Sequence, residues 1–275
     1  MKMAIRLFKK KSSRPAYGWF GNYPTWQEAV RVSDGYDKHN ILEKTKAALL
    51  KVKSGEAVYE RDSVLFEKKM YPFPLITYLL HSAKQKRTPL NILDFGGSLG
   101  STYFQIREFL SPDLCSGWNI VEQAHYIDCG RLFFEDEVLK FHYSIEDCLA
   151  HGPVDLAILS SVVQFLPEPH AFLEKLAAYG FRHIIFDRTF FVNGDRDRIT
   201  VQNVWPSVYE ASYPSWFFNE EGFLRHFQAN YITGGEFSSY VPGESVLEID
   251  REPVAYAKGF YLTKKDITDQ PGLAS

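Results

Sequence analysis

The chain has 275 residues, of which 45% are hydrophobic, and its formal net charge of −3 gives a pI near 6.3. This length and hydrophobic content are enough for a globular protein with a sizeable core, and they exclude disorder over most of the chain. The slightly acidic balance gives no electrostatic reason to expect nucleic acid as a partner.

Residues 1–14, MKMAIRLFKKKSSR, form a basic tail without the apolar centre and cleavage site of a signal peptide. We expect a solvated tail, although a short basic segment can also touch anionic lipid. No apolar run of about 18 residues follows, so no stable membrane insertion is predicted. The three cysteines lack disulfide or zinc spacing and indicate a reducing compartment, so we predict a cytoplasmic protein.

Residues 15–88 are predicted to form an N-terminal helical cap. Thr25 and Glu28 have the spacing of a capping box, in which each side chain bonds the backbone N–H of the other residue. The segments 39–53 and 73–84 have apolar residues at helical spacing. We therefore expect a mainly helical extension packed against the domain that follows.

Residues 89–265 alternate short apolar runs with helical segments. This β-α alternation predicts a mostly parallel, Rossmann-like α/β sheet with helices on both faces. The nearly continuous apolar strands agree with a sheet that is covered on both sides. The expected strands are 91–95, 118–122, 139–144, 154–161 and 182–188, and the expected helices are 101–110, 124–137, 145–150, 169–180 and 219–227.

Residues 189–218 interrupt this pattern with two prolines, a charged stretch and many aromatic side chains. We predict an insertion that forms a substrate pocket or lid, although packing against the N-terminal helices would explain the aromatics equally well. Residues 245–265 then predict an antiparallel hairpin that finishes the sheet, and residues 266–275 are expected to be a flexible tail.

The most informative stretch is ILDFGGSLGS, residues 92–101. A strand ends at Asp94, and three glycines follow before a helix begins at Ser101. Glycines at such a turn let a ligand approach the backbone. The dinucleotide fingerprint would require glycine where Phe95 stands, and no P-loop Lys-Ser/Thr pair follows. We predict that the turn binds a cofactor through Asp94, Gly96, Gly97, Ser98 and Gly100.

The turn resembles the first motif of class I S-adenosylmethionine-dependent methyltransferases. Glu122 ends the next strand, close to the spacing of about 20 residues that is expected for a ribose-binding carboxylate, with Gln123 beside it. The stretches LDFGGSLGS, WNIVEQ, FDRTFF and YEASYPSWFF together resemble a bacterial family of methyltransferases with unassigned substrates, over roughly residues 18–265.

The resemblance implies a seven-stranded Rossmann-like sheet, and S-adenosylmethionine as cofactor with S-adenosylhomocysteine as product. It places the adenine near Ser144 and Ile145, and the methionine side and the acceptor near Ser160, Ser161 and Gln164. Strand-end polarity would also explain these residues. The candidate substrate contacts are Gln164, Arg188, Tyr209, Tyr213 and Trp216.

Two residues are candidates for acid–base chemistry. Asp187, at the end of the fifth strand, could act as a base or orient the acceptor, and a structural Asp187–Arg188 ion pair is the alternative. His170, at a helix start, could titrate near neutral pH, although surface polarity is the commoner role of such a histidine. The histidines are scattered without metal-binding spacing, so no metal is predicted.

The sequence therefore predicts a methyltransferase acting on an oxygen or nitrogen of a small or conjugated metabolite. An NAD(P)-dependent oxidoreductase is the first alternative, but Phe95 and the lack of a Tyr-x-x-x-Lys pair count against it. A non-catalytic binding protein with the same fold is the second alternative. A homodimer stays open.

Overall fold

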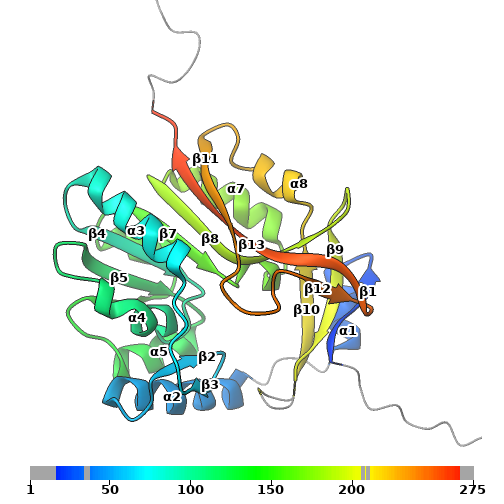
Figure 1. Cartoon of the computed structure of the whole chain (residues 1–275), viewed down its shortest axis with the longest axis horizontal. Helices are drawn as coiled ribbons and strands as arrows, with labels where there is room; N and C mark the ends of the chain where they lie inside the picture. Colours follow the sequence, from blue (N-terminus) through cyan, green and yellow to red (C-terminus); the bar gives the residue numbers. More distant parts are fainter. Residues whose placement is uncertain (1–16, 34–37, 206–207, 209–210, 267–275) are drawn as a thin grey trace, which may run out of the picture.

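The structure is a computed structural model that describes residues 17–33, 38–205, 208 and 211–266, without the side chains of 38–40. Among these residues, eleven strands form one large sheet (Figure 1), and β2 and β3 form a separate hairpin. The strands are β1 (Gly18–Tyr23), β2 (Tyr59–Arg61), β3 (Val64–Phe66), β4 (Leu90–Phe95), β5 (Cys115–Val121), β6 (Leu139–His142), β7 (Leu156–Ser160), β8 (His183–Val192), β9 (Arg198–Asn203), β10 (Ser212–Phe217), β11 (Tyr231–Ser238), β12 (Leu247–Ile249) and β13 (Glu252–Lys264).

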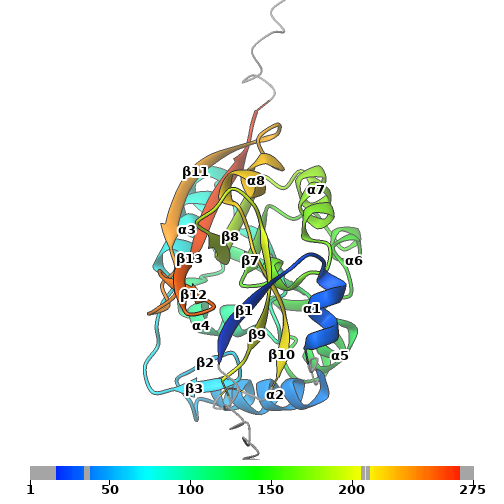
Figure 2. The same ribbon diagram turned by 90° about the vertical axis from the view of Figure 1, so that its right-hand side faces the viewer.

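The α-helices lie on both faces of the sheet (Figure 2). In the described part of the chain, no helix is both long enough and apolar enough to cross a membrane. The helices are α1 (Trp26–Val32), α2 (Lys38–Ser54), α3 (Phe73–Lys86), α4 (Ser101–Ile106), α5 (Ala124–Phe133), α6 (Ile145–Ala150), α7 (Pro169–Tyr179) and α8 (Glu220–Arg225).

Five parallel strands form the centre of the fold, in the order β6-β5-β4-β7-β8. This order reverses between β4 and β7, as in doubly wound Rossmann-type sheets. Strand β13 then pairs antiparallel with β8, and β11 pairs antiparallel with β13. The sheet has the Rossmann-like arrangement that the resemblance to class I methyltransferases implies, so the predicted fold class is confirmed.

The core has two halves because successive residues of a covered strand point to opposite faces. Ile92 and Trp118 contribute to the half that packs under α3, α4 and α5. Leu93 and Phe186 contribute to the other half, which packs against α6, α7 and α8. The apolar runs that suggested strands in the sequence are therefore buried on both sides, as expected for parallel strands.

The segment 15–88 is not mainly helical, because it also contains β1 and the β2–β3 hairpin. Strand β1 pairs antiparallel with β9, so that Gly18 lies opposite Asn203, and parallel with β12. Partners so distant in sequence leave no local signal at residues 18–23. The expectation of a helical cap is corrected to a mixed segment that contributes a strand to the sheet.

Residues 189–218 are also more regular than expected, because β8 extends to Val192 and is followed by β9 and β10. Thr200 and Val201 are buried in β9. Pro214 is tolerated because β10 is the edge strand of the sheet, where a missing N–H breaks no ladder. The insertion is thus a pair of sheet strands.

The predicted C-terminal hairpin is present as β12 and β13, joined by Asp250 and Arg251, which both have positive φ. Its place in the sheet differs from the expectation. Strand β13 does not finish the sheet but lies inside it, with β8 on one side and both β11 and β12 on the other. It therefore connects the Rossmann-like half to the strands β12, β1, β9 and β10.

Candidate functional site

A cavity of about 940 Å³ opens at the carboxyl ends of the parallel strands. Its volume is at the upper end of the range that small-molecule sites occupy. The point where the strand order reverses is also where ligands bind in open α/β sheets. The predicted residues that line the cavity are Asp94, Gly96, Gly97, Ser98, Glu122, Gln123, Ser144, Ile145, Ser160, Ser161, Arg188 and Tyr213.

The glycine turn has backbone reasons of its own for its glycines. Gly96 has φ of 74° and Gly100 has φ of 100°, a region that disfavours side chains. A Cβ at Gly96 would also overlap the Val162 side chain, and one at Gly97 would overlap the Asp94 carboxyl group. The turn is therefore shaped by neighbouring protein atoms as well as by any ligand. Gly100 itself precedes α4 and is not in the cavity wall.

Asp94 lies beneath the turn and is 1% exposed. Its Oδ2 accepts a hydrogen bond of 3.1 Å from the Trp118 indole N–H. Burial raises the pKa of Asp94 to about 7. The carboxyl group therefore supports the turn from the protein side, as well as contributing to the cavity wall.

Glu122 follows β5 and is half-buried in the cavity wall. Its Oε2 accepts a hydrogen bond of 2.5 Å from the backbone N–H of Gln123, and burial raises its pKa. Ser144 begins α6, and its hydroxyl accepts a hydrogen bond from the Asp147 N–H, so this side chain caps a helix. Ile145, the first residue of α6, is buried.

Two side chains at the ends of β7 and β8 are directly linked. Ser160 lies opposite Asp187 in the parallel register, and its hydroxyl donates a hydrogen bond of 2.8 Å to Asp187 Oδ2. Asp187 is 2% exposed and is absent from the cavity wall, whereas Ser160 lines it. Burial raises the pKa of Asp187 to about 6. Asp187 would therefore act on a ligand through Ser160.

Gln164 lies behind the wall and is fully buried. Its amide donates to the Ser161 hydroxyl at 3.2 Å and to the Arg188 carbonyl at 3.1 Å. It therefore supports the loop after β7 and does not itself line the cavity.

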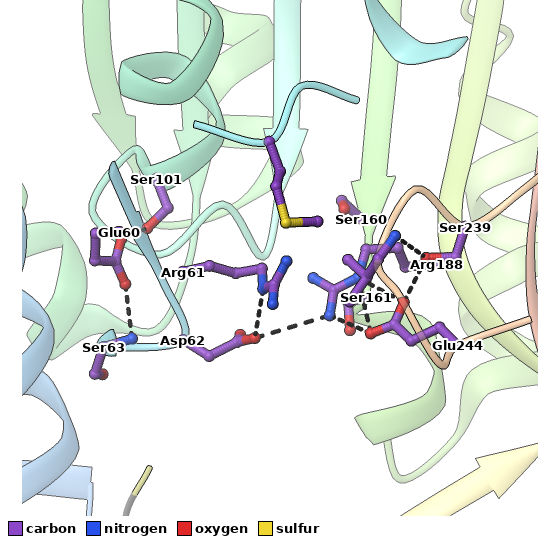
Figure 3. A network of polar contacts seen from close by, with 12 residues as sticks. Glu60, Arg61, Asp62, Ser63, Ser101, Ser160, Ser161, Arg188, Ser239 and Glu244 are labelled. Atoms are coloured by element: carbon purple, nitrogen blue, oxygen red, sulfur yellow. Dashed lines mark hydrogen bonds and ion pairs between the residues drawn. The ribbon is translucent and has the colours of Figure 1, made fainter. Parts of the chain in front are cut away.

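The alternative Asp187–Arg188 ion pair does not form, because Arg188 is paired with Glu244. Its guanidinium donates three hydrogen bonds of 2.6–3.2 Å to the Glu244 carboxylate, which also accepts one from Ser239. Asp62 Oδ2 lies 3.8 Å from Arg188 and 3.8 Å from Arg61, so it bridges the two guanidiniums (Figure 3). This network connects the β2–β3 hairpin to β8 across the cavity.

The sequence reasoning missed the β2–β3 hairpin as part of the site. Glu60 is 2% exposed and lines the cavity. Its carboxylate accepts hydrogen bonds of 2.7 Å from the Ser63 N–H and from the Ser101 hydroxyl, at the start of α4 (Figure 3). Burial raises the pKa of Glu60 to about 7. The turn residues Asp62 and Ser63 have positive φ, and their Asp-Ser pair is a weak hairpin signal in the sequence.

The remaining predicted residues separate. Tyr213 lines the cavity, whereas Trp216 lies outside its wall and donates its indole N–H to the Leu166 carbonyl. His170 also lies outside the wall, hydrogen-bonded to Asp197 and His226 at 2.6 and 2.9 Å. Tyr209 is outside the described residues. The structure therefore gives His170 a role in joining α7 to its neighbours.

Backbone strain and perturbed pKa values gather around this cavity. Of the eight non-glycine residues with positive φ among those described, five line it: Asp62, Ser63, Ser98, Ser161 and Arg188. Three buried carboxyl groups with raised pKa values lie in or directly behind its wall: Glu60, Asp94 and Asp187. Both features are characteristic of functional sites.

No family model matches the chain, and no curated protein matches its sequence. Three solved structures are similar to it. They are a magnesium protoporphyrin IX methyltransferase from Synechocystis with bound SAM (12% identity, 89% of this chain, 86% of that chain, TM-score 0.44), the N-terminal domain of EvdMO1 with SAH bound (10%, 84%, 98%, 0.48), and a Burkholderia thailandensis 1,6-didemethyltoxoflavin-N1-methyltransferase with bound 1,6-didemethyltoxoflavin and S-adenosylhomocysteine (11%, 85%, 92%, 0.40). The strand order of the sheet is the direct evidence of the fold.

Proposed function

We propose that the chain is an S-adenosylmethionine-dependent methyltransferase that acts on an oxygen or nitrogen of a small or conjugated metabolite. One observation carries this proposal. The glycine turn after β4, Glu122 after β5 and the start of α6 after β6 line a single cavity at the edge where the strand order reverses. Three successive strand ends of a class I sheet thus face one space of suitable volume.

The cavity wall fits the donor in its polar groups. Glu122 uses Oε2 for the Gln123 N–H, and a carboxylate can accept several further hydrogen bonds, so it can hold the ribose hydroxyls. Ile145 offers an apolar contact for the adenine, while the Ser144 hydroxyl stays with its helix cap. The methionine part would lie along Gly96, Gly97 and Ser98. Ser160 and Ser161 line the same cavity beyond the turn.

A nicotinamide cofactor fits less well. Phe95 occupies the place of the first glycine that a pyrophosphate-binding turn requires. The strand after β8 in the sheet is the antiparallel β13, whereas the Rossmann order for dinucleotides continues with a further strand of the parallel set. Both features favour the methyl donor.

The bound donor supplies an activated methyl group together with its own leaving group. The protein has to align the acceptor, exclude water and, for a hydroxyl acceptor, accept a proton. Glu60 is the stronger candidate for that proton, because its carboxyl group lines the cavity and its pKa is raised to about 7. Asp187 is covered by Ser160 and His170 lies outside the wall, so these earlier candidates are assigned positioning and structural roles.

Calorimetry with S-adenosylhomocysteine tests the proposal through Glu122. Glu122→Ala removes the carboxylate, and charged hydrogen bonds contribute about 1.5–3 kcal/mol, so we expect at least about tenfold weaker binding. Glu137→Ala removes an exposed carboxylate before β6 and serves as the matched control with unchanged affinity. Equal affinities for the two variants would place the cofactor elsewhere.

A further inference from the structure

Two histidines that are far from any metal-binding spacing in the sequence come together at the end of β6. His142 is its last residue, and His151 follows the last turn of α6. Asp147 lies between them, with Oδ2 3.9 Å from His142 Nδ1 and Oδ1 3.8 Å from His151 Nδ1. One ligand atom from each residue lies within 4.8 Å of the others. The histidines are therefore not all scattered in space, although none was predicted to cluster.

The protonation of His142 follows from its neighbour Asn119. The Asn119 amide nitrogen donates to Asn91 Oδ1 at 2.7 Å and to the Ile92 carbonyl at 2.9 Å, which fixes its other atom as the oxygen. That oxygen lies 3.1 Å from His142 Nε2, so Nε2 must carry the hydrogen. In the neutral ring, Nδ1 is then a bare lone pair. Burial lowers the pKa of His142, which favours this neutral form.

This lone pair is in an unfavourable position unless a cation joins it. His142 is 5% exposed, and its Nδ1 has no hydrogen-bond partner among the described residues. The nearest charged group is the Asp147 carboxylate, which is also rich in lone pairs. Arg131 lies 3.9 Å from Asp147 Oδ2, but its guanidinium donates to the Phe141 carbonyl and reaches only the carboxylate. A buried acceptor beside an acceptor calls for a shared cation.

We propose that His142, Asp147 and His151 bind a divalent transition-metal ion of the zinc type. Two imidazoles and one carboxylate are a ligand set that zinc accepts, with water in the fourth position. The bond from His142 Nε2–H to Asn119 is the outer-shell contact that orients a ligating histidine. His151 donates its Nδ1 hydrogen to the Asp147 carbonyl in this structure, and its side chain is 66% exposed, so the ring is free to turn toward the ion.

The ion would join the end of β6 to the end of α6. The residues between these two points include Tyr143, Ser144 and Ile145, which line the large cavity. Metal binding would therefore fix that side of the cavity wall. The inference does not depend on the proposed methyl transfer, because it concerns ligands outside the wall and a different readout.

Zinc titration of the full-length chain tests the site, after removal of any affinity tag and treatment with a chelator. We expect one zinc per chain in the wild type, and a Co²⁺-loaded sample with the visible absorption of a tetrahedral ion. His151→Ala and Asp147→Asn each remove one ligand and should weaken binding by at least about tenfold, because loss of an outer-shell partner alone costs about 10–100-fold. His81→Ala removes an exposed histidine from α3 and is the matched control, with unchanged binding.

Two results would overturn the inference. A wild-type chain that takes up less than one zinc has no such site. Binding that both ligand variants retain, or that His81→Ala weakens equally, is adventitious. Circular dichroism of each variant separates loss of the ligand from loss of the fold, and His151→Ala is the decisive variant because its side chain is largely in solvent.

Discussion

The hydroxyl of Ser160 donates a hydrogen bond of 2.8 Å to the carboxylate of Asp187, at the carboxyl ends of two neighbouring parallel strands. Asp187 is buried and Ser160 faces the cavity, so the bond passes the influence of a hidden carboxylate to an accessible hydroxyl. Burial raises the pKa of Asp187 to about 6, so the charge of this pair changes within a range that experiments reach easily.

The coupling between these two side chains should depend on pH. A double-mutant cycle of Ser160→Ala and Asp187→Ala isolates their interaction in the free energy of unfolding. We expect a coupling of about 2 kcal/mol at pH 8, where the carboxylate is ionised, and about 1 kcal/mol at pH 5, where it is protonated. Urea unfolding measures both values. The pair Ser160→Ala and Glu137→Ala should be additive, and an equal coupling at both pH values would contradict the ionisation of Asp187.

Asp94 should make the protein less stable as the pH rises. Its pKa of about 7 in the folded state is above the unfolded value, so the folded state holds a proton that the unfolded state releases. That contribution is fully present below about pH 4 and is lost as the pH rises through about 7. Asp94→Asn keeps an acceptor for the Trp118 N–H and has no charge to bury.

We therefore expect the wild type to lose about 2 to 3 kcal/mol of unfolding free energy, relative to Asp94→Asn, between pH 5 and pH 8. Urea unfolding of both proteins at the two pH values measures this difference. A variant that follows the wild type in parallel over this range would show that the Asp94 carboxyl is already ionised at pH 5.

Gly96 is constrained by the protein itself. Its φ of 74° and the overlap of any Cβ with Val162 predict that Gly96→Ala lowers the free energy of unfolding by about 1–3 kcal/mol. Gly194→Ala, at an exposed position with open space around it, should change stability by less than about 0.5 kcal/mol. Thermal unfolding compares the two variants.

Adding Val162→Ala to the Gly96→Ala variant separates the two causes. The smaller side chain removes the overlap but leaves the positive φ, so we expect partial recovery of the unfolding temperature beyond the effect of Val162→Ala alone. No recovery would assign the whole cost to the backbone. Substitutions at Gly96 therefore change the fold as well as any ligand site, and Glu122 is the cleaner probe of cofactor binding.

The sequence predicted those parts of the fold that local patterns determine. The strands that contain Leu93 and Ile158 are apolar on both faces, and the helices between them have clear periodicity. The glycine turn and Glu122 follow from motif and spacing, and both line the cavity.

The parts that depend on distant partners were missed. Strand β1 exists because Trp19 and its neighbours pair with β9, about 180 residues later, and no pattern within residues 18–23 requires this. The direction of a strand-end side chain is equally non-local. Asp187 and Ser160 both end strands, but only the assembled sheet determines which of them faces the cavity. Glu60 was missed because its hairpin has neither strong periodicity nor a typical turn pair.

The most direct test of the account is titration calorimetry of the full chain with S-adenosylhomocysteine, NAD and NADP. We expect S-adenosylhomocysteine to bind in the micromolar range with one site per chain, and the two nicotinamide cofactors to give no binding heat. Binding of NAD or NADP instead would contradict the interpretation of Phe95 and of the antiparallel β13. Absence of binding by all three would contradict the assignment of the cavity to a methyl donor.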